Sequence, residues 1–448
     1  MQLSLGNALL SVWETGPLQS LLLFFAILLI LAQYLQRRRQ HHNCPPSPPG
    51  LPILGNFFQM VFKNPQMTIQ KFAKKYGNVF WIHVGSLTYM TATGLPLIKE
   101  VLLNQAQVFI DRPQVPVHFH GFKTLAKGEV LNTVDKVTCL ASILFRDVDI
   151  DNEVDTLPEL VQSLGGSEAT CGREELYKMF PWIMKFLPGN HQKFFREWKK
   201  LETFVECVIK QHKEDLNPEE TLDFIDAYLK ELSKDNIHSC FNEKKLVFCT
   251  LDLFFAGTET TSTTLRWALL YMPLYPEIQG KIQAEIDWVV GQSRQPTMAD
   301  KENMPYTNAA IHEVQRMGYI VPFNVTRVAT VDTTVEEYHV PKGAVLMTNL
   351  TALHRDPKEW ATPETFNPEH FLENGQFKKR EFFLPFSIGK RVCLGEQLAQ
   401  GELFLFFTCL LQKFTFQAPP NIQLSMEIRS GLTISPASYQ ICAIPRVM

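Results

Sequence analysis

The stretch Phe386-Ser387-Ile388-Gly389-Lys390-Arg391-Val392-Cys393-Leu394-Gly395 decides how this chain is interpreted. It places one cysteine near two glycines and an arginine. Glycine lets the backbone approach a flat ligand closely. The helix expected at 396–412 would set its N-terminus, which stabilises an anion, beside the sulfur of Cys393. An isolated cysteine is most often a small buried hydrophobic residue, but this pattern predicts a thiolate that ligates a metal.

The composition is that of a globular protein, with 448 residues, 45% of them hydrophobic and 20% charged. This length allows one large domain or two to three small ones. The net charge of -3 predicts no general attraction to nucleic acid. The 33 Phe residues favour a large apolar interior or pocket. The nine Cys show no C-x-x-C pairing, which argues against a disulfide framework or a zinc site and favours a reducing compartment.

The N-terminal region predicts a membrane anchor. No residue from Thr15 to Gln36 is charged, and about 20 apolar residues suffice to span a bilayer as a helix. Arg37, Arg38 and Arg39 follow at once, which predicts that this flank stays cytoplasmic. A cleaved signal peptide is the alternative, but the basic residues follow the apolar run and no small-x-small cleavage site comes after it. Residues 1–36 are therefore a predicted signal-anchor transmembrane helix, and 37–54 a basic, Pro-rich linker of extended backbone.

The remainder is expected to be mainly α with a small β region. Strands are predicted at 78–93 and within 325–350, where Pro341-Lys342-Gly343 favours a turn. The longest helical pattern covers 246–271, is apolar on both faces and should cross the interior, with Pro273 ending it. Further helices are predicted at 95–105, 191–213, 221–233, 276–290, 305–317 and 396–412.

Two patterns within these helices need an explanation. The run Ala256-Gly257-Thr258-Glu259-Thr260 lies midway along the long apolar helix, where glycine and polar side chains are costly. Either the run has a chemical role or its hydroxyl groups bond back to the preceding turn. Glu313 and Arg316 are three positions apart, which places a carboxylate and a guanidinium on one helix face. Most such pairs are solvated surface pairs, but this helix is otherwise fairly apolar.

Together these motifs resemble the cytochromes P-450, which are haem-thiolate monooxygenases. The pattern F-x-x-G-x-R-x-C-x-G from Phe386 to Gly395 is similar to their haem-binding loop, and Glu313 with Arg316 to their E-x-x-R motif. The tracts 251–271 and 350–357 resemble the mammalian microsomal second family, and within it the J subfamily. The resemblance implies the cytochrome P-450 fold for residues 55–448 and haem b as the cofactor, with Cys393 as the axial iron ligand.

The resemblance also assigns roles to individual residues. Thr260 and Glu259 become the alcohol and the acid that deliver protons in the oxygen-activation motif. Glu313, Arg316 and His370 form a buried structural triad that supports the haem pocket. Other residues are expected to contact the haem or its propionates, although each arginine taken alone is more often an ordinary surface residue; they are Phe386, Gly389, Arg391, Arg327, Arg112, Ala256 and Gly257.

Partners and substrates follow from the same resemblance. NADPH–cytochrome P-450 reductase is expected to supply electrons, with cytochrome b5 as an optional further donor. The basic cluster of Lys378, Lys379, Arg380 and Lys390 could dock an acidic reductase, or it is only a solvated charge run. The protein is expected in the endoplasmic reticulum membrane with its catalytic domain on the cytosolic side. Expected substrates are lipophilic, namely polyunsaturated fatty acids such as arachidonate, and xenobiotics.

The resemblance has one break, between about Arg112 and Asp155. Members of the family carry a helix there with a W-x-x-x-R motif that binds a propionate, yet this interval contains no Trp. The chain therefore resembles one with an internal deletion around 112–155, as in a splice variant or an imperfect gene model. The loss of a packed helix should cost more free energy than a typical domain's stability of ~5–15 kcal/mol unless the remaining chain repacks. The alternative function is thus a catalytically impaired or haem-poor form without monooxygenase activity.

Overall fold

The computed structural model describes residues 24–25, 27–28, 31, 43–51, 54–61, 65–85, 87–113, 190–234, 241–431 and 433–446. The predicted membrane anchor, residues 1–36, lies almost wholly outside this set, and so does the stretch 114–155 of the predicted deletion. Among the described residues, no helix has both the length and the apolar character needed to cross a bilayer.

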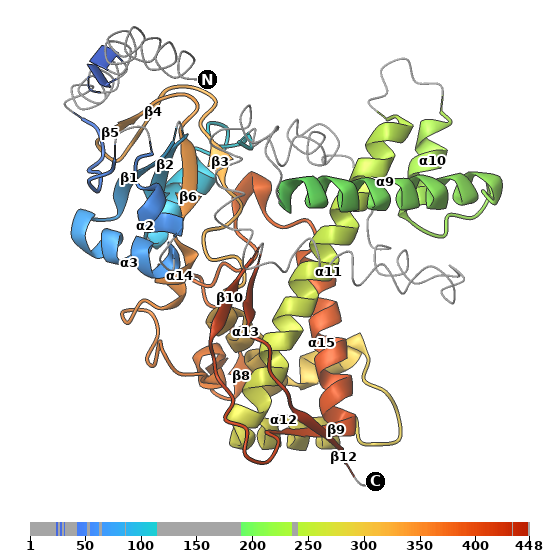
Figure 1. Ribbon diagram of the computed structural model, residues 1–448. Coiled ribbons are helices and arrows are strands. Elements are labelled where there is room, and N and C mark those ends of the chain that lie inside the picture. The colour runs from blue at the N-terminus through green and yellow to red at the C-terminus, as the bar shows by residue number, and fades with distance from the viewer. Residues whose placement is uncertain are drawn as a thin grey trace, which may run out of the picture.

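One part of the molecule is built around a four-stranded sheet (Figure 1). Its order is β1 (Val79–Val84), β2 (Leu87–Ala92), β6 (Val345–Thr348) and β3 (Arg327–Val328). β1 pairs antiparallel with β2, β2 parallel with β6, and β6 antiparallel with β3. The predicted strand pair at 78–93 is therefore present. The elements near this sheet are α2 (Phe57–Val61), α3 (Pro65–Tyr76), α4 (Leu95–Lys99), the π-helix η1 (Glu100–Asn104), β4 (Thr333–Val335), β5 (Tyr338–Val340) and α14 (Leu350–His354).

The other part is helical and is organised by α11 (Glu243–Leu274), which runs through the molecule in Figure 1. One end of α11 meets α9 (Asn190–Glu214) and α10 (Phe224–Leu232). The other end packs against the helices α12 (Pro276–Val289), α13 (Pro305–Gly318) and α15 (Glu396–Lys413). The short elements of this part are η4 (Met298–Asn303), η5 (Pro368–Phe371), β7 (Leu372–Glu373), β8 (Gln376–Phe377), η6 (Gly389–Arg391), β9 (Phe414–Gln417), β10 (Ile428–Ser430), β11 (Ile434–Pro436) and β12 (Cys442–Pro445).

The largest apolar cluster lies where these four helices meet. Trp267 of α11, Ile282 of α12, Val314 of α13 and Phe404 of α15 are all buried in it. Trp267 also donates a hydrogen bond from Nε1 to the carbonyl oxygen of Ile434, at 2.9 Å. The buried indole therefore keeps a polar partner, and α11 is fixed to the β10–β11 hairpin.

The prediction that Pro273 ends the long helix is wrong, because α11 includes Pro273 and ends at Leu274. A proline removes one backbone N–H and disturbs the preceding turn, but in the last turn there is little helix left to disturb. The end is set by Pro276 instead. The residue before a proline is disfavoured in the α region, and Tyr275 leaves it with φ -131° and ψ 67°.

Candidate functional site

The Cys393 loop enters α15 through a tightly folded turn. The backbone N–H of Cys393 donates to the carbonyl oxygen of Phe386, at 2.9 Å. Gly389 has φ +79°, and a Cβ atom built there would lie 2.2 Å from the carbonyl oxygen of Leu102 in η1. Only glycine fits this position, both for its backbone angle and for the close approach of η1. The loop is therefore anchored on the π-helical turn behind it.

Opposing electrostatic effects act on the pKa of the Cys393 thiol. Cys393 keeps an exposed face, yet the surrounding protein desolvates its sulfur, and this desolvation raises the pKa of the thiol. A hydrogen bond from the backbone of Gly395, the N-cap of α15, lowers that pKa, and Glu396 raises it. A bound metal ion deprotonates a thiol outright. The loop thus presents a thiol that is accessible from one side and that a bound metal ion would deprotonate.

Three guanidinium groups gather beside this loop. Arg112 donates from Nη1 to the carbonyl oxygens of Val325 and Thr326, at 2.6 and 3.0 Å. Arg391 donates from Nε to the carbonyl oxygen of Ile110, at 2.9 Å. Burial lowers the pKa of Arg112 to about 9, and the nearby Arg327 and Arg391 contribute to the same direction. Repulsion between the arginines thus acts on the pKa of Arg112 and Arg327, whereas Asp111 raises that of Arg391. An anionic ligand would offset this repulsion.

Arg327 supplies the strongest sign of that ligand. The residue is only 2% exposed, and its Nε and Nη1 atoms have no hydrogen-bond partner among the described residues. Its Nη2 donates to Ser387 Oγ at 3.2 Å and to the carbonyl oxygen of Ile388 at 3.3 Å. Burial lowers its pKa to about 10, and Arg391 adds to this. Buried unpaired donors are costly, so a carboxylate-bearing group such as a haem with its propionates fits here.

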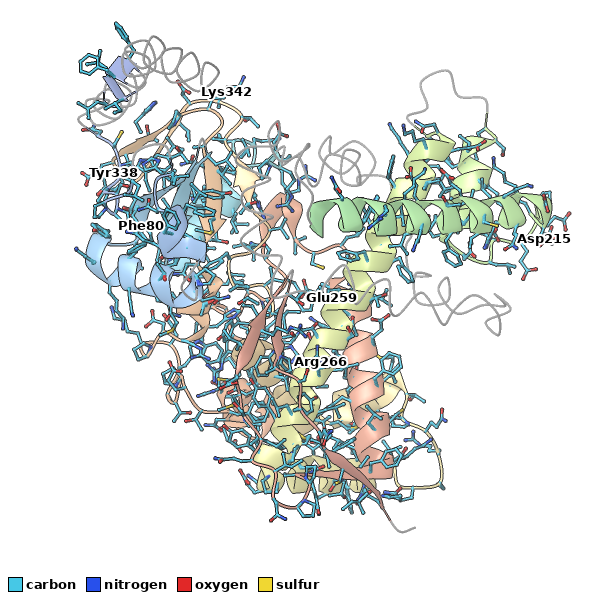
Figure 2. All side chains as sticks on the ribbon, in the orientation of Figure 1. Phe80, Asp215, Glu259, Arg266, Tyr338 and Lys342 are labelled. Atoms are coloured by element: carbon cyan, nitrogen blue, oxygen red, sulfur yellow. The ribbon has the colours of Figure 1, made fainter. Side chains whose placement is uncertain are left out.

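The polar run of α11 keeps a continuous helix. Thr260 Oγ1 donates to the carbonyl oxygen of Ala256 at 2.8 Å, which is the back-bonded arrangement that the sequence left as an alternative. Ala256 is exposed among the described residues, and none of those outside α11 lies within 4 Å of a Cβ built at Gly257. Glu259, midway along α11 in Figure 2, accepts a hydrogen bond from Thr433 Oγ1 at 2.7 Å.

The structure brings Glu313, Arg316 and His370 together. Arg316 donates from Nε and Nη2 to the two carboxylate oxygens of Glu313, both at 2.7 Å, and both side chains are fully buried. His370 Nδ1 lies 3.2 Å from Glu313 Oε1. Arg316 also reaches the carbonyl oxygens of His354 and Pro363, both at 2.8 Å. The pair is therefore a buried, bidentate one that joins α13 to two distant segments.

Other residues that hold the loop could not be found from the sequence. His354 Nε2 accepts a hydrogen bond from the Leu384 backbone at 3.1 Å, and burial lowers the pKa of this imidazole to about 3, so it stays neutral. Asn324 donates from Nδ2 to Ser387 Oγ at 2.7 Å. Asn324 and Ser387 have φ of 60° and 67°, a backbone region that is uncommon for non-glycine residues.

A pocket of about 600 Å³ opens beside Cys393, between Lys301, His312, Val392, Leu394 and Gln400.

Two of the four residues in the predicted basic cluster form ion pairs with neighbours. Lys378 pairs with Glu373 at 2.6 Å and Lys379 with Glu396 at 3.1 Å. Arg380 donates from Nε to the carbonyl oxygen of His370 at 2.7 Å. Lys390 is exposed. The cluster therefore presents less free positive charge than its sequence suggests.

A mainly helical domain with an accessible cysteine thiol, a buried guanidinium and a close backbone approach beside that cysteine is compatible with a haem-thiolate protein. The family model described as Cytochrome P450 matches residues 45–142 and 136–443. Cytochrome P450 2J2 of Homo sapiens is 51% identical over 462 residues, covering 90% of this chain and 91% of that protein. Cytochrome P450 2J5 of Mus musculus is 50% identical with the same coverage, and cytochrome P450 2B4 of Oryctolagus cuniculus is 35% identical, covering 90% and 94%.

The chain therefore belongs to the cytochrome P450 family, and it is similar to the 2J proteins. This confirms the predicted fold family, the predicted monooxygenase class and the predicted cofactor. Proteins of this family hold haem iron through a cysteine thiolate and receive electrons from a reductase. The chain is thus a haem-dependent monooxygenase by family.

Proposed function

We propose that Cys393 is the axial ligand of haem in this chain and that the enzyme inserts one oxygen atom into lipophilic substrates. The observation that carries the proposal is the position of Arg327. Its unpartnered Nε and Nη1 atoms are buried beside the Cys393 loop. Haem bound there supplies the oxygen-activating chemistry, and the residues around it hold it in place.

Each residue has a distinct part in holding the cofactor. Arg112, Arg327 and Arg391 bind the propionates, since the three guanidinium groups lie close enough to influence one another's pKa. Gly389 lets the loop lie against η1, and the Gly395 amide stabilises the thiolate. Phe386 covers the sulfur side of the loop. The triad of Glu313, Arg316 and His370 is structural and supports the loop from behind.

We assign the proton-handling role to α11. Thr260 Oγ1 holds a proton that it now donates to Ala256, and Glu259 holds a carboxylate bonded to Thr433. None of the described residues outside α11 lies within 4 Å of a Cβ built at Gly257. A rotation of the Thr260 side chain would release its hydroxyl from Ala256. Thr260 and Glu259 would then hold the protons that the chemistry of a bound haem requires.

The substrate class rests on similarity to the 2J proteins at about half identity. We propose polyunsaturated fatty acids such as arachidonate, by epoxidation or hydroxylation, and lipophilic xenobiotics. The abundance of Phe fits an apolar pocket for such molecules. Residues 1–36 would anchor the protein in the endoplasmic reticulum membrane, 37–54 would form the linker and 55–448 the cytosolic catalytic domain.

The electron donor we propose is NADPH–cytochrome P450 reductase, with cytochrome b5 as a second donor. A groove of about 610 Å³ beside the Cys393 loop has Lys99, Lys379 and Arg380 among its lining residues. Basic groups there favour an acidic partner. The ion pairs of Lys379 with Glu396 and of Lys99 with Glu381 weaken this attraction.

A second candidate function is a haem-poor or catalytically impaired form. The family model matches in two overlapping pieces, 45–142 and 136–443. The alignment with the human 2J2 protein extends over 462 residues although it takes up only 90% of 448 residues, so several dozen of its positions have no counterpart here. Both observations support an internal deletion. The absence of a Trp between Arg112 and Asp155 supports the loss of one propionate partner.

The reduced, carbon monoxide-bound absorption spectrum of the full chain decides between the two. Thiolate-ligated haem gives a strongly red-shifted Soret band, which we expect for the wild type and not for Cys393→Ser. Cys207→Ser is the matched control, since Cys207 is an exposed cysteine of α9. A wild type without that band has the impaired function. NADPH-dependent turnover of arachidonate with reductase then tests the substrate class.

A further inference from the structure

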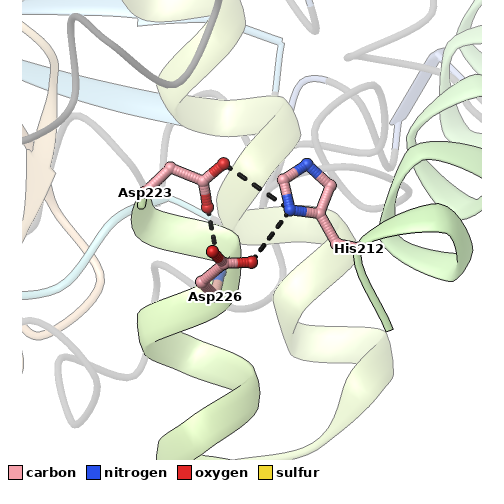
Figure 3. Close-up of side chains that lie close together, drawn as sticks. All are labelled: His212, Asp223 and Asp226. Carbon is pink, nitrogen blue, oxygen red and sulfur yellow. Dashed lines mark hydrogen bonds and ion pairs between the residues drawn. The ribbon is translucent and has the colours of Figure 1, made fainter. Parts of the chain in front are cut away.

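A second cluster of side chains with metal-ligating atoms lies at the junction of α9 and α10, as Figure 3 shows. His212 Nδ1 is 3.0 Å from Asp226 Oδ1 and 3.5 Å from Asp223 Oδ2. The three ligand atoms all lie within 4.8 Å of one another. The other ring nitrogen of His212 points away from both carboxylates. The proposed monooxygenase site uses none of these residues.

The backbone fixes both carboxylates before any ion binds. Asp223 is the N-cap of α10, and its Oδ1 accepts a hydrogen bond from the Asp226 amide at 2.9 Å. Asp226 Oδ2 accepts from the Leu222 amide at 3.2 Å. Each carboxylate therefore has one oxygen held by an N–H group and the other turned toward His212. A site whose ligands are already oriented loses less conformational freedom when it binds.

Apart from the two amide hydrogen bonds, His212 is the single basic side chain that pairs with these carboxylates among the described residues. Asp223 and Asp226 are 7% and 5% exposed, and the ion pairs they make in the described part of the chain are with His212 alone. Lys213, next to His212, pairs with Glu243 instead, and Lys230 of α10 donates to the backbone carbonyl oxygen of Glu220 and to Thr221 Oγ1. Two carboxylates buried against one imidazole leave excess negative charge, which is costly without a cation.

We propose that His212, Asp223 and Asp226 bind a divalent transition-metal ion of the zinc class. Zinc bonds of about 2.0–2.2 Å to nitrogen and oxygen place tetrahedral ligands about 3.3–3.6 Å apart, close to the two separations that His212 Nδ1 makes. An imidazole ligand favours zinc-like ions over Mg²⁺ and Ca²⁺. His212 is 27% exposed, which leaves a fourth position for water. Cysteine spacing could not predict this site, because it contains no cysteine.

The test compares Zn²⁺ binding by the full chain with binding by His212→Gln, using equilibrium dialysis and metal analysis. The matched control is Glu214→Gln, which changes an exposed residue two positions further along α9. All three proteins keep the same cysteines, so the difference isolates the cluster. We expect His212→Gln to bind one Zn²⁺ fewer per chain, and Zn²⁺ to raise the melting temperature of the wild type and of Glu214→Gln only.

Asp226→Asn is the second variant, because it keeps an oxygen that can accept from Leu222 while it removes the charge. We expect its Zn²⁺ affinity to fall at least tenfold, with the far-ultraviolet circular dichroism unchanged. Equal Zn²⁺ content in the wild type and both cluster variants would overturn the proposal. The three residues would then only form ion pairs that join α9 to α10. Mg²⁺ binding as tight as Zn²⁺ binding would overturn the zinc class. Neither result depends on haem, so the monooxygenase proposal stands or fails separately.

Discussion

Gly389 and the carbonyl oxygen of Leu102 are so close that a Cβ atom at position 389 would lie 2.2 Å from that oxygen. The contact joins the Cys393 loop to η1, a π-helical turn more than two hundred residues earlier in the chain. Single π-turns are often found at functional sites. The position of Cys393 therefore depends on a backbone-to-backbone contact that only glycine allows.

Gly389→Ala should displace the loop and lower haem binding. The left-handed backbone alone costs about 1–2 kcal/mol for a residue with a Cβ, and the clash with a backbone oxygen adds to it because neither partner can rotate away. We expect a sharp drop in haem content per chain, measured from the reduced carbon monoxide spectrum. Gly280→Ala on α12 is the control, since nothing lies within 4 Å of its Cβ and helix propensity favours Ala there by about 1 kcal/mol. Normal haem content in Gly389→Ala would contradict this account.

Glu313→Gln should lower the free energy of unfolding more than the loss of any exposed ion pair does. The Arg316 guanidinium would remain buried without its bidentate carboxylate, and breaking one partner of a buried pair costs about 3–5 kcal/mol. This is a large share of a domain's ~5–15 kcal/mol. The free energy of unfolding in urea measures it. Glu373→Gln, which breaks an exposed pair with Lys378, should leave that free energy almost unchanged.

The sequence predicted the Cys393 loop and the course of the long helix because both are local patterns. The i,i+3 spacing of Glu313 and Arg316 likewise follows from one helix face. Their burial does not, because it depends on carbonyl oxygens of His354 and Pro363, 38 and 47 residues away from Arg316. The convergence of Arg112, Arg327 and Arg391 also depends on tertiary structure alone.

Some local features could not be predicted from the sequence, because the same residues allow more than one local structure. The polar run could have a chemical role or bond back to its own helix, and in the fold the Thr260 hydroxyl is bonded to Ala256. Pro273 was expected to end α11, yet a proline in the last turn is tolerated and Pro276 sets the end. The partners of Asp223 and Asp226 depend on how α9 and α10 meet.

Asp252 should make the protein less stable as the pH rises. Asp252 is 7% exposed, neither carboxyl oxygen has a hydrogen-bond partner in the described part of the chain, and burial raises its pKa to about 8. Below its unfolded pKa, about 3.9, both states are protonated. Between about pH 4 and pH 8 the folded state holds a proton that the unfolded state has lost, so the free energy of unfolding falls by at most about 1.4 kcal/mol per pH unit from this group.

Asp252→Asn removes that titration, and we expect its unfolding midpoint in urea to exceed the wild-type midpoint at pH 8 by much more than at pH 5. Asp215→Asn is the control, because Asp215 is exposed at the end of α9. If wild type and Asp252→Asn kept the same difference at both pH values, Asp252 would have a partner that balances its charge in the folded protein.

Arg327→Met should have opposite effects on the protein without haem and with it. Without haem, the change removes a buried guanidinium whose Nε and Nη1 have no partner, so the free energy of unfolding should stay the same or rise. With haem, the same change removes a charged hydrogen-bond donor to a propionate, worth about 1.5–3 kcal/mol. Haem affinity should therefore fall about 10- to 100-fold, as measured by haem transfer to an apo-acceptor protein.

The two directions together separate a cofactor role from a packing role. Replacing a residue that only packs would destabilise the protein both without and with haem. Replacing a residue that binds an anionic ligand would destabilise only the haem-bound protein. Arg196→Met, on the exposed face of α9, should change neither quantity. A loss of stability in the haem-free Arg327→Met protein, with unchanged haem affinity, would mean that the bonds from Arg327 to Ser387 and Ile388 are the reason for the arginine, and the propionate assignment would be wrong.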